Sequence, residues 1–123
     1  MNITAVKMIF KLFSGFDCDE SSEYDPIIEI SMAEVERMVI DPAHRSDVRL
    51  VYLSAALANY RYRQILCGQD RSEITYAGKI IKDEHDISLN YAEKMFRDYL
   101  RLCSDILKTT DFVFAAFSDG EEV

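Results

Sequence analysis

The residues that could do chemistry in this chain are two histidines and nearby carboxylates in two polar segments. His44 follows an aspartate within 41–44, and His85 lies between Asp83 and Asp86. Imidazole nitrogens and carboxylate oxygens are ligands for zinc, manganese and iron, so these side chains could form the metal site of a helical enzyme. Their spacing is not specific for any metal, and ordinary surface histidines are the favoured interpretation.

Sequence motifs of well-known catalytic sites are missing. A ferritin-like di-metal bundle needs inward-facing glutamates and Glu-x-x-His pairs on its helices. Segment 46–67 contains no glutamate, and neither histidine follows a glutamate by three residues. Glycine-rich phosphate loops and the G-x-S-x-G motif of hydrolases are absent as well. We therefore predict a protein that is not an enzyme and that binds no metal or other cofactor.

The three cysteines of the chain are far apart in the sequence and odd in number. This pattern favours free thiols in a reducing compartment over a set of disulfides. Cys67 is close in sequence to Arg63 and Arg71 and could be partly activated, but a buried structural role is favoured for it. Cys103 falls on an apolar helix face and is predicted to lie in the core.

The chain has 123 residues, of which 49% are hydrophobic, and a formal net charge of −8. This length fits a single domain, 1–123, with its own hydrophobic core. The negative charge argues against specific or non-specific nucleic-acid binding and against anionic membranes, because these partners are negative themselves. No stretch approaches the roughly 20 apolar residues of a membrane span, and residues 1–11 lack the cleavage site of an export signal. We expect a soluble, cytoplasmic protein.

Hydrophobic periodicity predicts a first helix within 1–15. Apolar residues recur there at steps of three and four between Ile3 and Phe13, and Gly15 is a plausible helix stop. Residues 16–30 contain six acidic residues and no basic one. We expect an acidic loop over this second range.

The range 31–117 is predicted to form the main helical bundle. Ser31 and Glu34 have the spacing of a capping box, which predicts a short helix that starts at Ser31 and ends near Asp41. Residues 111–117 form an aromatic cluster that is expected to dock as a final helical turn, and residues 118–123 are expected to fray.

Two long helices are the strongest prediction from periodicity. Residues 46–67, with Ser46 or Asp47 as the cap, and residues 87–107 each carry a continuous apolar stripe. Between them, residues 69–86 contain β-prone runs on either side of an Ala-Gly pair at 77–78, which predicts a short hairpin. The fold class is therefore mainly α, a small bundle with two long antiparallel helices and a short β-hairpin or extended excursion between them.

Arginines are concentrated on the central helix and its flanks. One interpretation is a solvated helix face that balances the acidic range 16–30. The other is a docking face for an acidic partner or a second copy of the chain, with Tyr60 and Tyr62 interleaved. The arginines concerned are Arg45, Arg49, Arg61, Arg63 and Arg71.

Three segments in this order carry a resemblance to a known family. They are the alanine-rich helix with a Tyr-x-Tyr pair at 48–62, the Ala-Gly-centred run at 75–82, and the closing Asp-Phe-Val-Phe at 111–114. Together they resemble small head-tail connector (neck or adaptor) proteins encoded in prophages of Gram-positive bacteria. The resemblance covers about residues 46–117 and does not extend to the acidic segment or to the first helix.

The resemblance implies a structural virion-assembly subunit that joins a ring between portal and tail. Partners would be further copies of the chain, with a ring as one form, and a portal or tail protein. No specific nucleic acid, membrane or small-molecule substrate is implied, and the subunit would be cytoplasmic in the host and then part of the virion. The residues assigned to partner binding are Tyr76, Lys79, Ile80 and Ile81 of the hairpin, and Arg49, Arg61 and Arg63 of the central helix.

Two alternatives to the connector remain open. One is a host regulatory or adaptor module whose arginine-rich helix binds an acidic protein. The other, less favoured, is the metal-dependent helical enzyme built on His44, Asp83, His85 and Asp86.

Overall fold

The computed structural model describes residues 1–15, 21–70 and 76–108, and the side chains of these except 21–22, 69–70 and 76–85. This part of the chain is mainly helical, as predicted. In chain order its helices are α1 (Ile3–Ser14), the short 3-10 helix η1 (Ser21–Tyr24), α2 (Asp25–Met38), the 3-10 helix η2 (Pro42–Ser46), α3 (Val48–Asp70) and α4 (Tyr76–Leu102).

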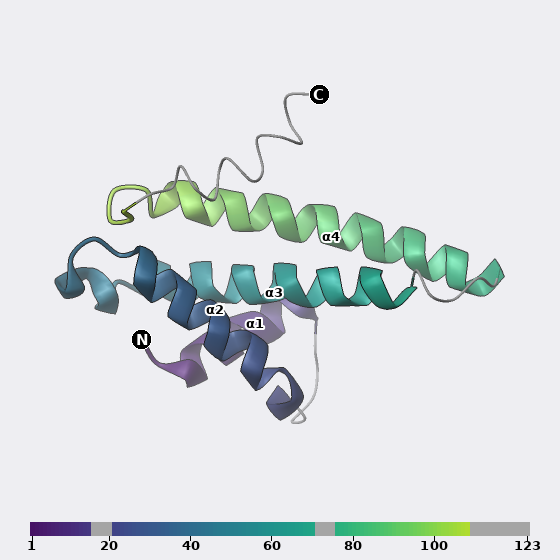
Figure 1. The fold of residues 1–123 in the computed structure, drawn as a ribbon, viewed down its shortest axis with the longest axis horizontal. Helices are drawn as coiled ribbons and strands as arrows, with labels where there is room; N and C mark the ends of the chain where they lie inside the picture. Colours follow the sequence, from purple (N-terminus) through teal and green to yellow (C-terminus); the bar gives the residue numbers. More distant parts are fainter. Residues whose placement is uncertain (16–20, 71–75, 109–123) are drawn as a thin grey trace.

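Helix α3 is the centre of the bundle. In Figure 1, α4 runs antiparallel along one side of α3, while α1 and α2 pack on the other side. The predicted cap at Asp47 is confirmed, because its Oδ1 accepts the backbone N–H of Arg49 at 2.9 Å. Leu53 of α3 is buried in one cluster with Phe96 and Leu100 of α4, and this apolar seam holds the two long helices together.

Helix α1 contributes a second apolar cluster on the opposite side of α3. Its beginning is capped by the Asn2 side chain, which accepts the backbone N–H of Thr4 at 2.9 Å. It ends at Gly15, whose φ of 77° is the left-handed conformation that glycine adopts without strain. Val6 and Phe10 are fully buried, so this helix is anchored by two side chains one turn apart.

The predicted start of the second helix at Ser31 is wrong, because α2 begins at Asp25. Proline in the first helical turn lacks only an N–H that would be unpaired there anyway, so Pro26 opens the helix. Ser31 is fully buried inside α2, and its Oγ donates to the Ile27 carbonyl at 2.7 Å. The expected loop over 16–30 is therefore helical from 21 onward, and residues 16–20 lie outside the described part.

The expected β-hairpin is not seen. The sequence predicts the turn and the second strand over residues 76–82, but these residues form the beginning of α4. Residues 71–75 lie outside the described part. A two-stranded hairpin on its own is marginally stable in water. A helix over these residues instead continues the helix that the apolar periodicity predicts from residue 87 onward. Gly68 also fails to end α3, which continues to Asp70.

The chain leaves α4 earlier than predicted and then pairs with the end of α2. Residues 103–107, expected to be helical, form a turn in which Cys103 and Ile106 are buried. The N–H of Ile40 donates to the Ile106 carbonyl at 3.0 Å, and the N–H of Lys108 donates to the Met38 carbonyl. This short antiparallel bridge ties one end of the bundle; the predicted elements at 111–117 and 118–123 lie outside the described residues.

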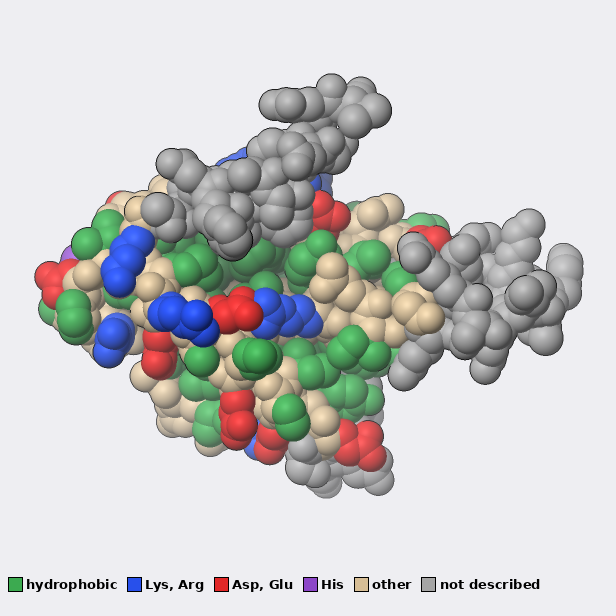
Figure 2. All heavy atoms as spheres, viewed as in Figure 1, with side chains coloured by type: hydrophobic (Ala, Val, Ile, Leu, Met, Phe, Trp, Pro, Cys, Tyr) green, Lys and Arg blue, Asp and Glu red, His purple; other side chains and the backbone are tan. Residues whose placement is uncertain are grey.

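The surface of the described part is mixed in character. On the face in Figure 2, apolar side chains reach the surface over α2 and α3 and are interleaved with acidic and basic ones. None of the helices in 1–15, 21–70 and 76–108 has the length and apolar composition needed to cross a bilayer.

Candidate functional site

Arg49, one of the predicted partner-binding residues, links the beginning of α3 to the turn after α4. Its Nη1 donates to the Leu102 carbonyl at 2.8 Å and to Asp105 Oδ1 at 3.0 Å. Its Nη2 donates to Asp105 Oδ2 at 3.2 Å and to Asp47 Oδ2 at 2.9 Å. Because the guanidinium bonds two carboxylates and caps the last carbonyl of α4, Arg49 fixes how the ends of the two long helices meet.

These hydrogen bonds also change the acidity of the groups. Arg49 lowers the pKa of both Asp47 and Asp105, mainly through side-chain hydrogen bonds to their charged forms. When the pKa of a carboxyl is lower in the folded state than in the unfolded state, the group stabilises the fold at pH values above its unfolded pKa. This stabilisation is lost as the pH falls through the pKa of the folded state. The ordinary value for both groups is 3.8, so the loss falls below about pH 4.

We expect Arg49→Met to flatten the acid dependence of stability. Without the guanidinium, Asp105 loses the main cause of its lowered pKa, and the pKa of Asp47 is then lowered chiefly by the backbone N–H of residue 49, so the two carboxylates favour the folded state less at neutral pH. The measurement is the urea unfolding midpoint between pH 6 and pH 3 for both proteins. Arg45→Met is the matched control, because Arg45 is exposed in η2 and its midpoint should follow the wild type. Parallel curves for wild type and Arg49→Met would contradict the role given to Arg49.

The other two predicted arginines of α3 are also bonded within the chain. Arg61 Nη2 donates to Glu34 Oε2 of α2. Arg63 Nη2 donates to the Ser14 carbonyl at the end of α1 at 2.7 Å, and its guanidinium lies 5.2 Å from the Tyr62 ring centroid. The three arginines therefore join α3 to α4, α2 and α1 in turn, and none of them pairs with a described residue of the acidic range 16–30. In that range Asp25 pairs with Lys7 of α1 instead.

The predicted partner-binding residues do not form one site. Residues 76–81, which include Tyr76, Lys79, Ile80 and Ile81, lie in the first turns of α4. Arg49 lies beside the other end of α4, because it contacts Leu102 and Asp105. Residues 76–81 and Arg49 are thus at opposite ends of the α3–α4 pair (Figure 1), and Arg61 and Arg63 lie between them along α3.

No protein-family model, curated protein or solved structure matches this chain. The connector resemblance therefore stays a prediction. A function for this chain has to be argued from its own contacts and surface.

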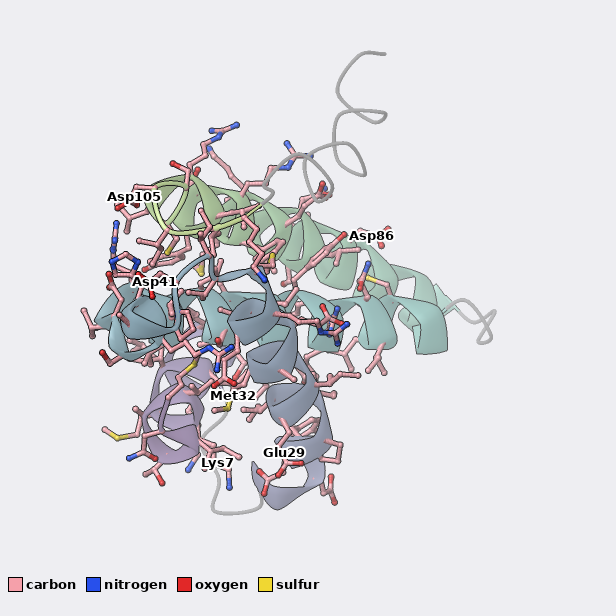
Figure 3. All side chains as sticks on the ribbon, turned by 60° about the vertical axis from the view of Figure 1, so that its left-hand side comes forward. Lys7, Glu29, Met32, Asp41, Asp86 and Asp105 are labelled. Carbon is pink, nitrogen blue, oxygen red and sulfur yellow. The ribbon has the colours of Figure 1, made fainter. Side chains whose placement is uncertain are left out.

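The described part of the chain holds no group of three or more metal-binding side chains. His44 is exposed in η2, whose first turn is capped by Asp41. His85, expected in a loop, is in α4, and Figure 3 shows Asp86 of that helix far along the bundle from Asp41. The structure therefore does not bring His44 and Asp86 together, and the side chains of Asp83 and His85 lie outside the described part.

Both described cysteines are buried, as predicted for Cys67 and Cys103. Burial raises the pKa of the Cys103 thiol to about 11. Since the thiolate is the reactive form, Cys103 is almost entirely protonated at neutral pH and is a packing residue.

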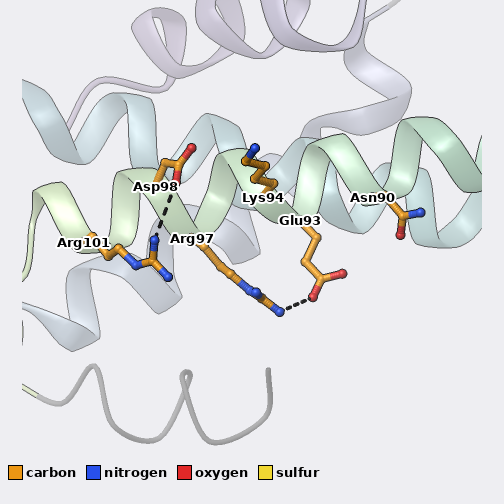
Figure 4. A pocket seen from close by; sticks show the side chains of 6 residues that line it. All are labelled: Asn90, Glu93, Lys94, Arg97, Asp98 and Arg101. Carbon is orange, nitrogen blue, oxygen red and sulfur yellow. Dashed lines mark hydrogen bonds and ion pairs between the residues drawn. The ribbon is translucent and has the colours of Figure 1, made fainter. Parts of the chain in front are cut away.

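One shallow hollow lies on the outer face of α4 (Figure 4). Arg97 pairs with Glu93 at 2.8 Å, and Arg101 lies 4.0 Å from Asp98. These pairs are three or four residues apart on one helix, a spacing that stabilises helices modestly. The described lining contains no histidine, cysteine or hydroxyl nucleophile, and it consists of Asn90, Glu93, Lys94, Arg97, Asp98 and Arg101.

Exposed apolar side chains on α1 and α2 are the feature that the sequence prediction missed. Met8 and Leu12 of α1 are 67% and 73% exposed, and Ile30 of α2 is 54% exposed. The sequence contains a signal for this exposure. Met8 and Leu12 fall outside the apolar stripe that contains the buried Val6 and Phe10, and α1 has few polar residues to cover its outer side.

Asn59 is a second residue that periodicity did not single out. It lies in the middle of α3 and is 3% exposed, and its Oδ1 has no hydrogen-bond partner among the described residues. A buried unpaired polar atom costs about 1–3 kcal/mol of stability. Nothing in the described part of the chain explains it.

Proposed function

We propose that this chain is a structural subunit of a larger protein assembly, namely a head-tail connector subunit of a prophage-type particle. In this proposal the chain works by contacts between copies and with a portal or tail protein. The shape and surface of the bundle support the proposed role in assembly, and the family resemblance suggests the kind of particle.

The observation that carries the proposal is the α3–α4 pair, which extends past α1 and α2 at one end of the bundle (Figure 1). This helical arm takes the place of the expected β excursion, and residues 76–81 lie on it. An arm that leaves the body of a small domain is suited to reach a neighbouring subunit. Ile80 and Ile81 are the apolar residues that we assign to that contact.

Apolar side chains at the surface add support. Helix α1 exposes Met8 and Leu12, and clustered exposed apolar residues commonly mark protein–protein contact sites.

The adaptor alternative has weaker support. It needs arginines that are available to an acidic partner, but Arg49, Arg61 and Arg63 each donate to groups of the same chain. A partner would have to replace these internal bonds. We therefore place the partner contact on apolar surface rather than on the arginines.

Native mass spectrometry of the purified chain over a concentration series tests the proposal. We expect one closed oligomer of many identical copies, because head-to-tail contacts that close by rotation give rings. A monomer at every concentration up to roughly a hundred micromolar would contradict self-assembly, because the contact between copies would then be weaker than about 5–6 kcal/mol.

A variant of the arm locates the contact. Ile80→Asp combined with Ile81→Asp should remove the oligomer while the unfolding midpoint stays near that of the wild type. Val48→Asp is the matched control, because Val48 is 66% exposed at the other end of α3. An oligomer that survives the double substitution would show that the arm is not part of the contact.

A further inference from the structure

The side of α3 between α2 and α4 carries a stacked aromatic pair. The Tyr60 ring packs on the Phe96 ring of α4, with 6.2 Å between the centroids and 10° between the planes. The next residue, Arg61, bonds Glu34 of α2, so successive residues of α3 contact the two flanking helices. Gln64 follows by one turn, points between these two directions and is exposed. Among the described helices, none covers this side of α3 at Gln64 (Figure 1).

The described part of the chain ends with Lys108, at the edge of this surface. The N–H of Lys108 donates to the Met38 carbonyl, and Leu107 pairs with Val39 in an antiparallel bridge. Because the pairing is antiparallel, Lys108 directs the following residues along α2 toward its beginning. Met38 packs against the same apolar cluster as the aromatic pair, so the chain leaves Lys108 beside that cluster.

The distance from Lys108 to the aromatic pair is short. Glu34 lies four residues before Met38, which is about 6 Å along the axis of α2. Because Glu34 bonds Arg61, its level on α2 is also the level of Tyr60 on α3. An extended chain advances about 3.3 Å per residue, so about two or three residues after Lys108 are enough to reach this level. The next segment of the sequence is therefore within reach of the Tyr60 ring.

That next segment, 111–117, is strongly apolar and aromatic. It reads Asp-Phe-Val-Phe-Ala-Ala-Phe. Phenylalanine side chains gain free energy when they leave water, and contact with other aromatic rings adds to this gain. The Tyr60–Phe96 pair offers such rings at the place that the segment can reach.

The charge of the last residues fits the neighbouring face of α4. After Lys108 the chain contains no basic residue, and its acidic residues are Asp111, Asp119, Glu121 and Glu122. On the outer face of α4, next to Phe96, basic side chains outnumber acidic ones (Figure 4). The basic ones are Lys94, Arg97 and Arg101, and the acidic ones are Glu93 and Asp98. Opposite charges therefore favour this side of the bundle for the C-terminal residues.

We infer that residues 111–117 bind to the α2–α4 side of α3 in the same chain, with phenylalanine side chains against the Tyr60–Phe96 pair. The bond between Lys108 and Met38 holds the segment close to this surface, which gives the contact a high effective concentration. The bound segment completes the apolar packing on a side of α3 that the described helices leave open. Because the contact belongs to the fold of one copy, the inference does not depend on the proposed assembly.

A single tryptophan in the segment tests whether it is bound. The chain contains no tryptophan, so Phe114→Trp introduces the only one. We expect blue-shifted emission and several-fold slower quenching by acrylamide than in Leu12→Trp, the matched control, whose position is 73% exposed on α1. Emission and quenching equal to those of Leu12→Trp would overturn the inference. The emission should also stay constant on dilution, and a red shift would overturn the intramolecular contact by showing that the segment binds a second copy.

Proximity to Gln64 locates the binding surface. In Phe114→Trp with Cys18→Ser, a nitroxide label on Gln64→Cys should quench the tryptophan emission strongly compared with a diamagnetic label. Gln64 is exposed, so the label leaves the fold intact, and the natural Cys67 and Cys103 are buried. The same nitroxide on Val48→Cys, 66% exposed near the other end of α3, is the control and should leave the emission unchanged. Equal emission with the label at either position would show that the segment lies elsewhere.

Truncation of Tyr60 should release the segment. In the Phe114→Trp background, Tyr60→Ala should shift the emission to the red and speed acrylamide quenching toward that of Leu12→Trp. Tyr91→Ala is the matched control, because Tyr91 is 69% exposed on α4 and its truncation should leave the emission unchanged. Circular dichroism checks that both variants fold, and the Gln64 label decides the question if Tyr60→Ala does not. Unchanged emission in folded Tyr60→Ala would show that the aromatic pair is not the binding surface.

Discussion

Phe10→Ala should cost about 3–5 kcal/mol of the free energy of unfolding, one of the largest effects of any single substitution in this chain. Phe10 is fully buried, and its ring centroid lies 6.2 Å from Tyr24 and 6.1 Å from Tyr62. Those two tyrosines pack edge to face at 5.2 Å. Removing Phe10 therefore empties the centre of an aromatic cluster that joins α1, η1 and α3. The measurement is urea denaturation followed by circular dichroism.

Leu12→Ala is the matched control for Phe10→Ala. It lies two residues away on the same helix but is 73% exposed, so its cost should stay within about 0.5 kcal/mol. Because the Leu12 side chain is exposed, this variant should fold normally. Equal destabilisation by the two substitutions would show that α1 does not pack as described.

The parts of the fold that follow from local signals were predictable. Helix α1 has an apolar stripe and a Gly15 stop, and α3 has an apolar stripe and the Asp47 cap. Sequence and structure agree there because each of these signals lies within or beside the helix that it specifies. The burial of Cys103 also followed from its position on an apolar face.

The errors occurred where a residue type has two roles. Pro26 lies in the range 16–30 for which the sequence predicts a loop, although proline also suits the first turn of a helix. The β-prone residues 79–82 were interpreted as a strand, although a strand needs a pairing partner and a helix does not. Gly68 lies inside α3, which continues to Asp70, and unlike Gly15 it does not have the positive φ of a glycine that ends a helix.

The candidate site was less predictable than the fold because it depends on contacts between distant parts of the chain. The sequence located the arginines on one helix but could not show that Arg49 bonds Asp105 and that Arg61 bonds Glu34. Those partners are far away in sequence. Once they are known, the same arginines explain how α3 is oriented against its neighbours, and exposed apolar residues become the better candidates for binding.

The second large effect is expected for Leu100→Ala, at about 2–5 kcal/mol. Leu100 is fully buried on α4 and belongs to the apolar cluster that includes Leu53 and Phe96. Truncation would leave a cavity in the seam between the two long helices, where backbone relaxation is limited by the Arg49 bonds at the adjacent helix end. Urea denaturation gives the free-energy difference directly.

Leu102→Ala separates this packing effect from any general effect of alanine on α4. The Leu102 side chain is 53% exposed, and its backbone carbonyl, which accepts the Arg49 bond, is kept in the variant. Its cost should stay within about 0.5 kcal/mol. If Leu100→Ala were as mild as Leu102→Ala, the seam would not hold α4 in the isolated chain. The α3–α4 arm would then depend on the assembly for its stability, and the Leu100 effect should reappear when the oligomer is measured instead.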